Sequence, residues 1–337
     1  MTFAPRRRTL PGPSIGTSIG LWAAVALLAA GCLGGGTPNG GGGPDAGGGR
    51  GDDGRPVVLT TFTIIADIAQ NVAGEHLQVR SLIPVGAEVH SYEPTPADLR
   101  QAADADLILD NGLGLEAWFD QFIADVQAPH VVVSDGVQPL EVGAPAGGAT
   151  ESEGAPAESR PNPHAWMSPR QTQVYVDNMV TAFSELDPDR AQDYRANGQA
   201  YAEELEAVHT ELVDDLAALP QDRRALVTCE GAFSYLARDA ALSEHYLWPV
   251  NAESEATPRR IADTITFVNA QQVPAVFCES TVSDAAMQQV VEATDATFGG
   301  VLYVDSLSEP DGPVPTYLDL IRHDVHLIRT GLTGAQH

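Results

Sequence analysis

Two histidines and two acidic residues stand where their side chains could share one divalent metal ion. His90 and His164 each follow, after a loop, an apolar segment that is typical of a β-strand. Glu230 and Asp305 come directly after two further segments of this kind. In open parallel sheets, ligands bind beyond the carboxyl ends of the strands, so we expect these four side chains to converge. Two imidazoles with two carboxylates form a donor set that suits Mn(II) or Fe(II).

Each of the four residues also has an ordinary structural interpretation. A histidine near prolines is often a plain loop residue, Glu230 could act at a helix N-terminus, and Asp305 could form a turn. A metallohydrolase would use a similar cluster, but it keeps one metal position open for water. The chain contains no HExxH motif, nucleophile elbow or phosphate-binding glycine loop. We therefore expect a binding protein and no enzyme, with a metallohydrolase or a surface adhesin as the alternatives.

The elements that must position these residues follow a repeated pattern of strands and helices. The expected strands are residues 57–62, 77–83, 107–111, 130–134, 225–229, 245–250, 274–280 and 299–305. The expected helices are residues 64–72, 115–126, 168–186, 187–219, 258–269, 284–294 and 317–332, and a further one begins near Thr95. This alternation predicts parallel sheets with right-handed crossovers.

A long helix is expected at residues 187–219, because apolar side chains recur there at steps of three and four. We predict an α/β fold with two parallel-sheet lobes, 56–186 and 220–337, which this rigid helix joins. The metal site would lie in the cleft between the lobes. A single large doubly wound sheet is the alternative. Residues 141–161, rich in small and polar residues and without histidine, are expected to form a flexible insertion in the first lobe.

The first 32 residues have the features of an export signal and a lipid anchor. Three arginines precede an apolar run, residues 21–30, that is too short to span a bilayer. This run ends in LLAAGC, which resembles a bacterial lipobox with Cys32 as the lipid-anchored residue. A chance cysteine after an ordinary secretory signal is the alternative. Residues 33–55 are dominated by glycine and predict a flexible tether, so we expect an extracytoplasmic, membrane-anchored protein.

The charge of the chain favours small cations as ligands over polyanions. The 337 residues include 46 acidic and 18 basic ones, and the formal net charge is −28. Such a charge repels phosphate backbones, so we expect no nucleic-acid partner. The acidity could also serve solubility alone. The charge therefore supports a cation ligand but does not identify one.

Several segments carry a resemblance to a known family. They are HSYEPTPADL (90–99), NGLGLEAW (111–118), NPHAW (162–166), VTCEGAFSYLARD (227–239), YLWPVNAESEATP (246–258), YVDSL (303–307) and TYLDLI (316–321). With them the chain resembles the solute-binding lipoproteins of metal-importing ABC transporters, in particular the manganese and iron branch. The resemblance runs from about residue 56 to 332 and implies two α/β lobes bridged by a long helix.

The resemblance also implies the ligands, the cargo and the partners. The metal ligands of the family map onto His90, His164, Glu230 and Asp305. Mn(II) is the expected cargo, followed by Fe(II) and then Zn(II), and the partners are a membrane permease and its ATPase. We expect a monomer that pinches the ion between its lobes. Glu88 and Val89 replace the Asp-Pro that commonly precedes the first histidine, so the loop there should differ slightly.

Two further expectations concern cysteines and acid. In an exported protein, Cys229 and Cys278 most simply form one disulfide, although two buried thiols are the alternative. Acidification between pH 7 and pH 5 is expected to release the metal, because a proton on His90 or His164 removes a ligand lone pair.

Overall fold

The computed structural model describes residues 54–124, 126–142, 160–250 and 256–334. The predicted signal peptide and lipobox with Cys32, and nearly all of the predicted tether, lie outside these residues. Residues 143–159 of the predicted insertion also lie outside them. The two ends of the insertion are held together, because Glu141 and Pro161 form an antiparallel bridge.

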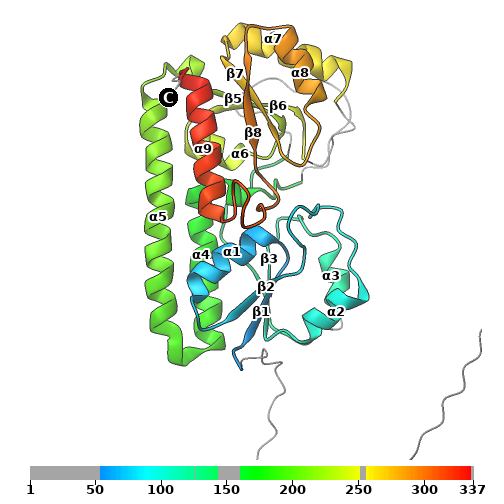
Figure 1. Ribbon diagram of the computed structural model, residues 1–337, viewed down its shortest axis with the longest axis vertical. Coiled ribbons are helices and arrows are strands. Elements are labelled where there is room, and N and C mark those ends of the chain that lie inside the picture. The colour runs from blue at the N-terminus through cyan, green and yellow to red at the C-terminus, as the bar shows by residue number, and fades with distance from the viewer. Residues whose placement is uncertain (1–53, 125, 143–159, 251–255, 335–337) are drawn as a thin grey trace, which may run out of the picture. The chain divides into compact units, whose positions relative to one another are not determined.

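The first lobe is built on a four-stranded parallel sheet (Figure 1). Its strands, in the order β2-β1-β3-β4, are β1 (Val57–Thr60), β2 (Gln78–Ser81), β3 (Leu107–Asp110) and β4 (His130–Val132). Its helices are α1 (Thr63–Ala73), α2 (Pro96–Ala103) and α3 (Phe119–Phe122). Strands β1 and β3 are buried along their whole length, as expected for central strands that are covered on both faces.

Helix α2 begins with a capping box that also holds the preceding loop. The Thr95 side chain accepts hydrogen bonds from the N–H groups of Ala97 and Asp98, and the Asp98 carboxylate accepts one from the Thr95 N–H at 2.7 Å. Pro96 follows at the first helical position, where an N–H is not needed. The Tyr92 hydroxyl donates to the same Asp98 carboxylate at 3.0 Å. The cap therefore anchors the loop that runs from β2 to α2.

Two short helices differ from the expectation. The helix expected at residues 115–126 is limited to α3, where Trp118, Phe119 and Phe122 pack against one another. Aromatic residues have only moderate helix propensity, and here their mutual packing decides the local structure. Helix α6 (Ser234–Asp239) was not expected from the sequence, because six residues are too few to show a period.

The second lobe contains two pairs of parallel strands. The pairs are β5 (Ala225–Glu230) with β6 (Ser243–Trp248), and β7 (Ala275–Glu279) with β8 (Thr297–Leu302). Strands β5 and β7 lie next to each other, so the order across the lobe is β6, β5, β7, β8. Helices α7 (Pro258–Gln271) and α8 (Ala285–Glu292) cover this lobe (Figure 1). The expected parallel α/β architecture is thus confirmed in both lobes.

Three long helices run beside the lobes. They are α4 (Pro169–Leu186), α5 (Ala191–Ala217) and the C-terminal α9 (Tyr317–Thr333). Helix α5 has 27 residues, which corresponds to about 40 Å at 1.5 Å per residue, and it packs against α1, α4 and α9. Figure 1 shows it extending alongside both lobes. The predicted long helix is therefore present, whereas the lobe boundaries at 186/187 and 219/220 stay a prediction.

Helices α4 and α5 approach each other closely at one glycine. A Cβ at Gly198 would lie 2.4 Å from Cγ2 of Val180 in α4, which is inside van der Waals contact. The apolar stripe of α5, from Tyr194 to Leu216, is buried against the same neighbours. A continuous core of apolar side chains therefore joins both lobes and the three helices.

Candidate metal centre

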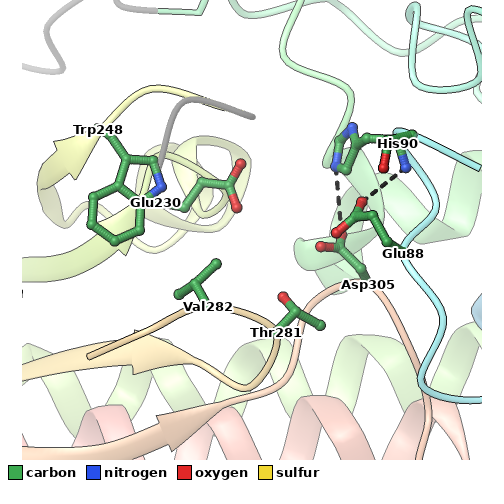
Figure 2. A pocket seen from close by; sticks show the side chains of 8 residues that line it. Glu88, His90, Glu230, Trp248, Thr281, Val282 and Asp305 are labelled. Carbon is green, nitrogen blue, oxygen red and sulfur yellow. Dashed lines mark hydrogen bonds and ion pairs between the residues drawn. The ribbon is translucent and has the colours of Figure 1, made fainter. Parts of the chain in front are cut away.

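Three of the four sequence-predicted ligands line one pocket of about 330 Å³, and the ring of the fourth, His164, lies 5.3 Å from that of His90. His90, Glu230 and Asp305 line the pocket together with Glu88 and Trp248. Figure 2 shows Glu230 and Trp248 on one side of the cavity and Glu88, His90 and Asp305 on the other. His90 belongs to the first lobe and Glu230 and Asp305 belong to the second, so residues of both lobes line the pocket.

His90 and Asp305 face each other across the lobes. His90 comes from the loop between β2 and α2, and Asp305 comes from the segment that leaves β8. Their side chains are 6% and 2% exposed, and His90 Nε2 lies 3.9 Å from Asp305 Oδ1. The loop that carries His90 touches this same segment, because the Gly86 N–H donates to Ser306 Oγ at 2.7 Å. Both residues are therefore withdrawn from bulk water and held side by side.

His164 is completely buried and its free nitrogen faces the site. Nδ1 and the backbone N–H of His164 both lie within hydrogen-bond distance of Asn162 Oδ1, at 3.0 and 3.1 Å. An amide oxygen can only accept, so Nδ1 carries the proton and Nε2 keeps a lone pair. That Nε2 lies 3.4 Å from Asp305 Oδ1 and has no hydrogen-bond partner among the described residues. His164 therefore has the tautomer of a metal ligand.

Asn162 links this histidine to the second lobe. Its Nδ2 donates to the carbonyl of Gly231 at 2.7 Å and to Ser234 Oγ at 3.1 Å. Gly231 directly follows Glu230. The Asn162 side chain therefore contacts one candidate ligand, His164, and the residue next to another, Glu230. Sequence reasoning assigned no role to Asn162, although it stands two residues before His164 in the NPHAW motif. Its role depends on a contact between segments 69 residues apart, which the sequence does not show.

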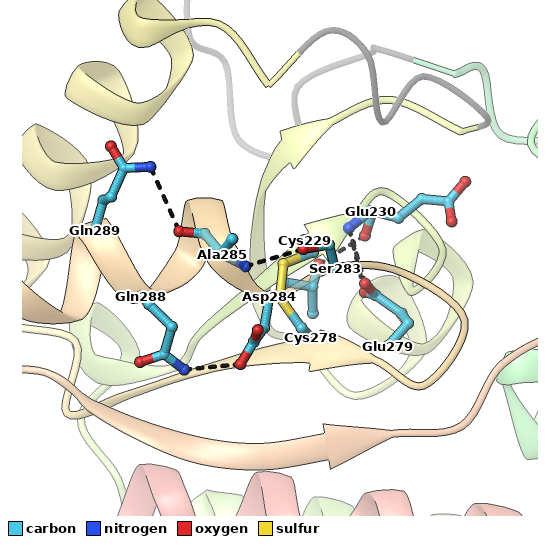
Figure 3. Close-up of a disulfide and its surroundings, with 10 residues drawn as sticks. Cys229, Glu230, Cys278, Glu279, Ser283, Asp284, Ala285, Gln288 and Gln289 are labelled. Carbon is cyan, nitrogen blue, oxygen red and sulfur yellow. Dashed lines mark hydrogen bonds between the residues drawn. A yellow bond between two sulfur atoms is a disulfide. The ribbon is translucent and has the colours of Figure 1, made fainter. Parts of the chain in front are cut away.

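Glu230 is the last residue of β5 and points toward the two histidines. One donor atom of each of Glu230, His90 and His164 lies within 4.8 Å of those of the other two. The backbone N–H of Glu230 donates to both carboxylate oxygens of Glu279, each at 3.2 Å. Figure 3 shows Glu279 at the end of the neighbouring strand β7, pointing at this N–H. Glu279 thus fixes the end of the strand that carries Glu230.

The predicted disulfide between Cys229 and Cys278 is present and lies next to Glu230 (Figure 3). It connects β5 to β7, with the two Cα atoms 4.8 Å apart. Both cysteines are buried and bonded to each other, so neither offers a thiolate to a metal. The donor set of the pocket therefore consists of nitrogen and oxygen atoms.

Burial shifts the pKa values of His90, His164, Asp305 and Glu279 toward the neutral form of each group. It lowers the pKa of His90 and that of His164 to about 4, so both imidazoles are neutral at pH 7. It raises the pKa of the Asp305 carboxyl, which the neighbouring His90 partly opposes. Burial, aided by the charge of Glu230, holds the pKa of Glu279 well above its usual range. The pocket thus combines neutral imidazoles with carboxylates whose charged form burial disfavours. A divalent cation would stabilise that charged form.

Glu88 is a further acidic residue of the site that sequence reasoning noted only as a departure from a family pattern. One donor atom of each of Glu88, His90 and Asp305 lies within 4.8 Å of those of the other two. Its position two residues before His90 was a usable signal, because a short loop keeps both side chains near the same cleft.

The described residues include no helix with the length and hydropathy of a membrane span.

The chain matches proteins of one known family over most of its length. Residues 58–331 match the family model of ZnuA, the zinc-uptake complex component A, periplasmic. The chain is 47% identical over 275 residues to the iron-binding protein YfeA of Yersinia pestis, which covers 81% of this chain and 85% of that protein. It is 31% identical over 313 residues to the manganese-binding lipoprotein MntA of Halalkalibacterium halodurans, which covers 92% of this chain and 96% of the relative.

A solved structure gives the same result for the fold. The Mn-bound periplasmic metal binding protein from Candidatus Liberibacter asiaticus superposes with a TM-score of 0.75 at 38% sequence identity, and the match covers 82% of this chain and all of that one. The expectation of a metal-binding solute-binding protein is thereby confirmed at the level of the family. The chain belongs to the ZnuA family of periplasmic metal-binding proteins.

Proposed function

We propose that this chain captures Mn(II), or Fe(II), as cargo and delivers it to the permease of an ABC importer. His90, His164, Glu230 and Asp305 are the proposed ligands. Two sets of distances carry the proposal: donor atoms of His90, His164 and Glu230 lie within 4.8 Å of one another, and Asp305 Oδ1 lies 3.9 Å from His90 Nε2 and 3.4 Å from His164 Nε2. The four residues are separated by up to 215 positions in the sequence. His164 Nε2 and Asp305 Oδ1 are both buried without a hydrogen-bond partner among the described residues, which is costly unless a ligand binds there.

The donor set favours Mn(II) or Fe(II) over Zn(II), even though zinc gives the family its name. Two carboxylates can supply more than two oxygen atoms, which allows more than four contacts, whereas zinc prefers four. Most such sites still bind Zn(II) at least as tightly as Mn(II), so selectivity must come from geometry and supply. The names of YfeA and MntA, an iron-binding and a manganese-binding relative, support this order. Zn(II) is the alternative cargo.

The proposal extends to location and partners. Cys32 would carry the lipid anchor, and the Gly-rich tether would hold the folded part outside the cytoplasm near the permease. The permease and its ATPase would take up the ion when the lobes open. We expect a monomer without nucleic-acid partners. We also expect no enzymatic activity, because protein donors would fill the positions that a catalytic metal keeps for water.

Metal titration of the purified, metal-free chain tests the ligand set. Asp305→Asn and Glu230→Gln each remove one charge with little change in shape, so both should fold and lose Mn(II) affinity by at least about 100-fold. Glu75→Gln, an exposed residue of the first lobe, is the matched control and should bind like the original chain. Mn(II) binding that is unchanged in both variants would refute the proposed site. Manganese uptake by cells lacking the protein, restored by the original chain but not by Asp305→Asn, tests delivery.

A further inference from the structure

Glu88 is an exposed acidic residue that lines the same pocket as His90, Glu230 and Asp305. Its carboxylate is close to both His90 and Asp305, since the three donor atoms lie within 4.8 Å of one another. His90 also belongs to the group with His164 and Glu230. The two groups share an imidazole, so Glu88 approaches the same centre as the buried ligands but from the solvent side.

The loop holds Glu88 firmly at this place. Glu88 Oε1 accepts a hydrogen bond from the His90 N–H at 2.9 Å, which directs the carboxylate back toward the imidazole. Val89 between them is completely buried, and Gly86 is bound to Ser306 of the second lobe. An ionised carboxylate has about four acceptor positions, so the bond from His90 leaves capacity for a metal ion. The side chain is therefore both placed and available.

Like Thr281, Glu88 also lines two cavities. It lines the pocket of about 330 Å³ with the proposed ligands and a neighbouring cavity of about 480 Å³ that Ser280, Ser306 and Ser308 help to line. The residue is exposed, whereas Asp305, Glu230 and His164 are buried. Figure 2 shows the Glu88 carboxylate beside that of Asp305, on the side of the pocket opposite Glu230.

We propose that Glu88 is a fifth protein ligand of the cargo ion and that it strengthens the preference of the site for Mn(II) and Fe(II) over Zn(II). This inference rests on the proposed function and adds a residue to its site. A third carboxylate adds an oxygen donor to a set that already allows more than four contacts, which suits a hard ion with six or more contacts and adds little for a four-coordinate zinc ion.

Glu88→Gln tests this role with little disturbance of the loop. The amide oxygen of glutamine can still accept the bond from the His90 N–H, while the negative charge and the strong donor are lost. Glu93→Gln is the matched control, because Glu93 is an exposed residue of the same loop. The measurements are competition titrations with Mn(II) and Zn(II), and the number of water molecules on bound Mn(II) from water-proton relaxation.

The fifth-ligand role predicts three results for Glu88→Gln. Mn(II) affinity falls by about 10-fold or more, Zn(II) affinity changes by less than about 3-fold, and one additional water binds to Mn(II). Glu93→Gln should behave like the original chain in all three. An unchanged Mn(II) affinity would overturn the inference. Equal weakening of both metals with no additional water would also overturn it, because Glu88 would then act through its charge alone.

The two proposals fail in different ways. If the original chain binds Mn(II) and loses it in Asp305→Asn but not in Glu88→Gln, only the fifth ligand is refuted. If the original chain binds no Mn(II), the proposed function and the role of Glu88 are both refuted.

Discussion

Lowering the pH from 7 to 5 tests whether burial keeps His90 and His164 in their neutral, metal-binding form. Burial holds the pKa of His90 and that of His164 at about 4 in the metal-free protein. Metal ions bind the neutral imidazole, so affinity falls only when the histidines of the free protein take up protons. Because both pKa values lie below pH 5, the imidazoles stay mostly neutral over this range.

Metal affinity should depend on pH much less than it would if both histidines had an ordinary pKa, and the difference is large enough to measure. With a pKa of about 6.5, each imidazole would cost about 25-fold in affinity between pH 7 and pH 5, and the pair about 600-fold. With a pKa of about 4, the two together cost only about 1.2-fold. The pKa values of Asp305 and Glu88 are raised, so we expect protonation of these carboxylates to cause most of the loss of metal affinity as the pH falls. The release step expected from histidine protonation therefore moves below pH 5.

NMR titration of the metal-free protein measures this directly. The ring nitrogen shifts of His90 and His164, assigned with single His→Gln variants, should report neutral imidazoles at pH 5. The same rings in urea-unfolded protein are the control and should titrate near pH 6.5. A midpoint near 6.5 for either ring in the folded, metal-free chain would refute the reasoning from burial.

Two further predictions concern stability. Replacing Cys229 and Cys278 by serine removes a disulfide that joins residues 49 positions apart. The free energy of unfolding, measured in urea, should fall by about 4 kcal/mol. A fall of less than about 1 kcal/mol would contradict a stabilising role of the disulfide. Glu244 is buried, receives a bond from Ser234 Oγ at 2.6 Å, and its pKa is raised by burial to about 7. Because the pKa of this carboxyl is raised, the folded state loses stability as the pH rises from about 4.5 through 7. Glu244→Gln removes this loss, so it should stabilise the folded protein by about 3 kcal/mol at pH 8 and by little at pH 5. Equal effects at both pH values in denaturant titrations would contradict this account.

Much of the fold was predictable because its signals are local. The buried runs of β1 and β5 and the capping box of α2 each lie within a few consecutive residues. The stripe along α5 repeats with the helical period over its whole length. Helix α3 was expected to be longer, because an aromatic cluster formed by packing ends it early. Local patterns thus predicted most elements, and packing corrected their ends.

The candidate ligands were predictable for a related reason. Glu230 ends strand β5, and His90, His164 and Asp305 lie in segments that follow β2, β4 and β8. Parallel strands end at a common edge of their sheet. Their chemical types alone indicated a divalent cation. The pairing of Cys229 with Cys278 followed from two cysteines in an exported chain. Cys32 and the other features of the N-terminus remain predictions from residue order.

Side-chain chemistry and chain periodicity are written in consecutive residues, so the amino-acid order alone specified two α/β lobes, a long helix and the types of the metal donors. Distances between donors 215 positions apart depend on how the lobes pack, and so does the dry environment that lowers the pKa values of His90 and His164. The support of His164 by Asn162, the contact of Glu279 with Glu230, and the approach of Glu88 to the centre are also long-range or loop-dependent. Only the folded chain defines them, because burial and hydrogen-bond geometry are properties of residues that meet in space.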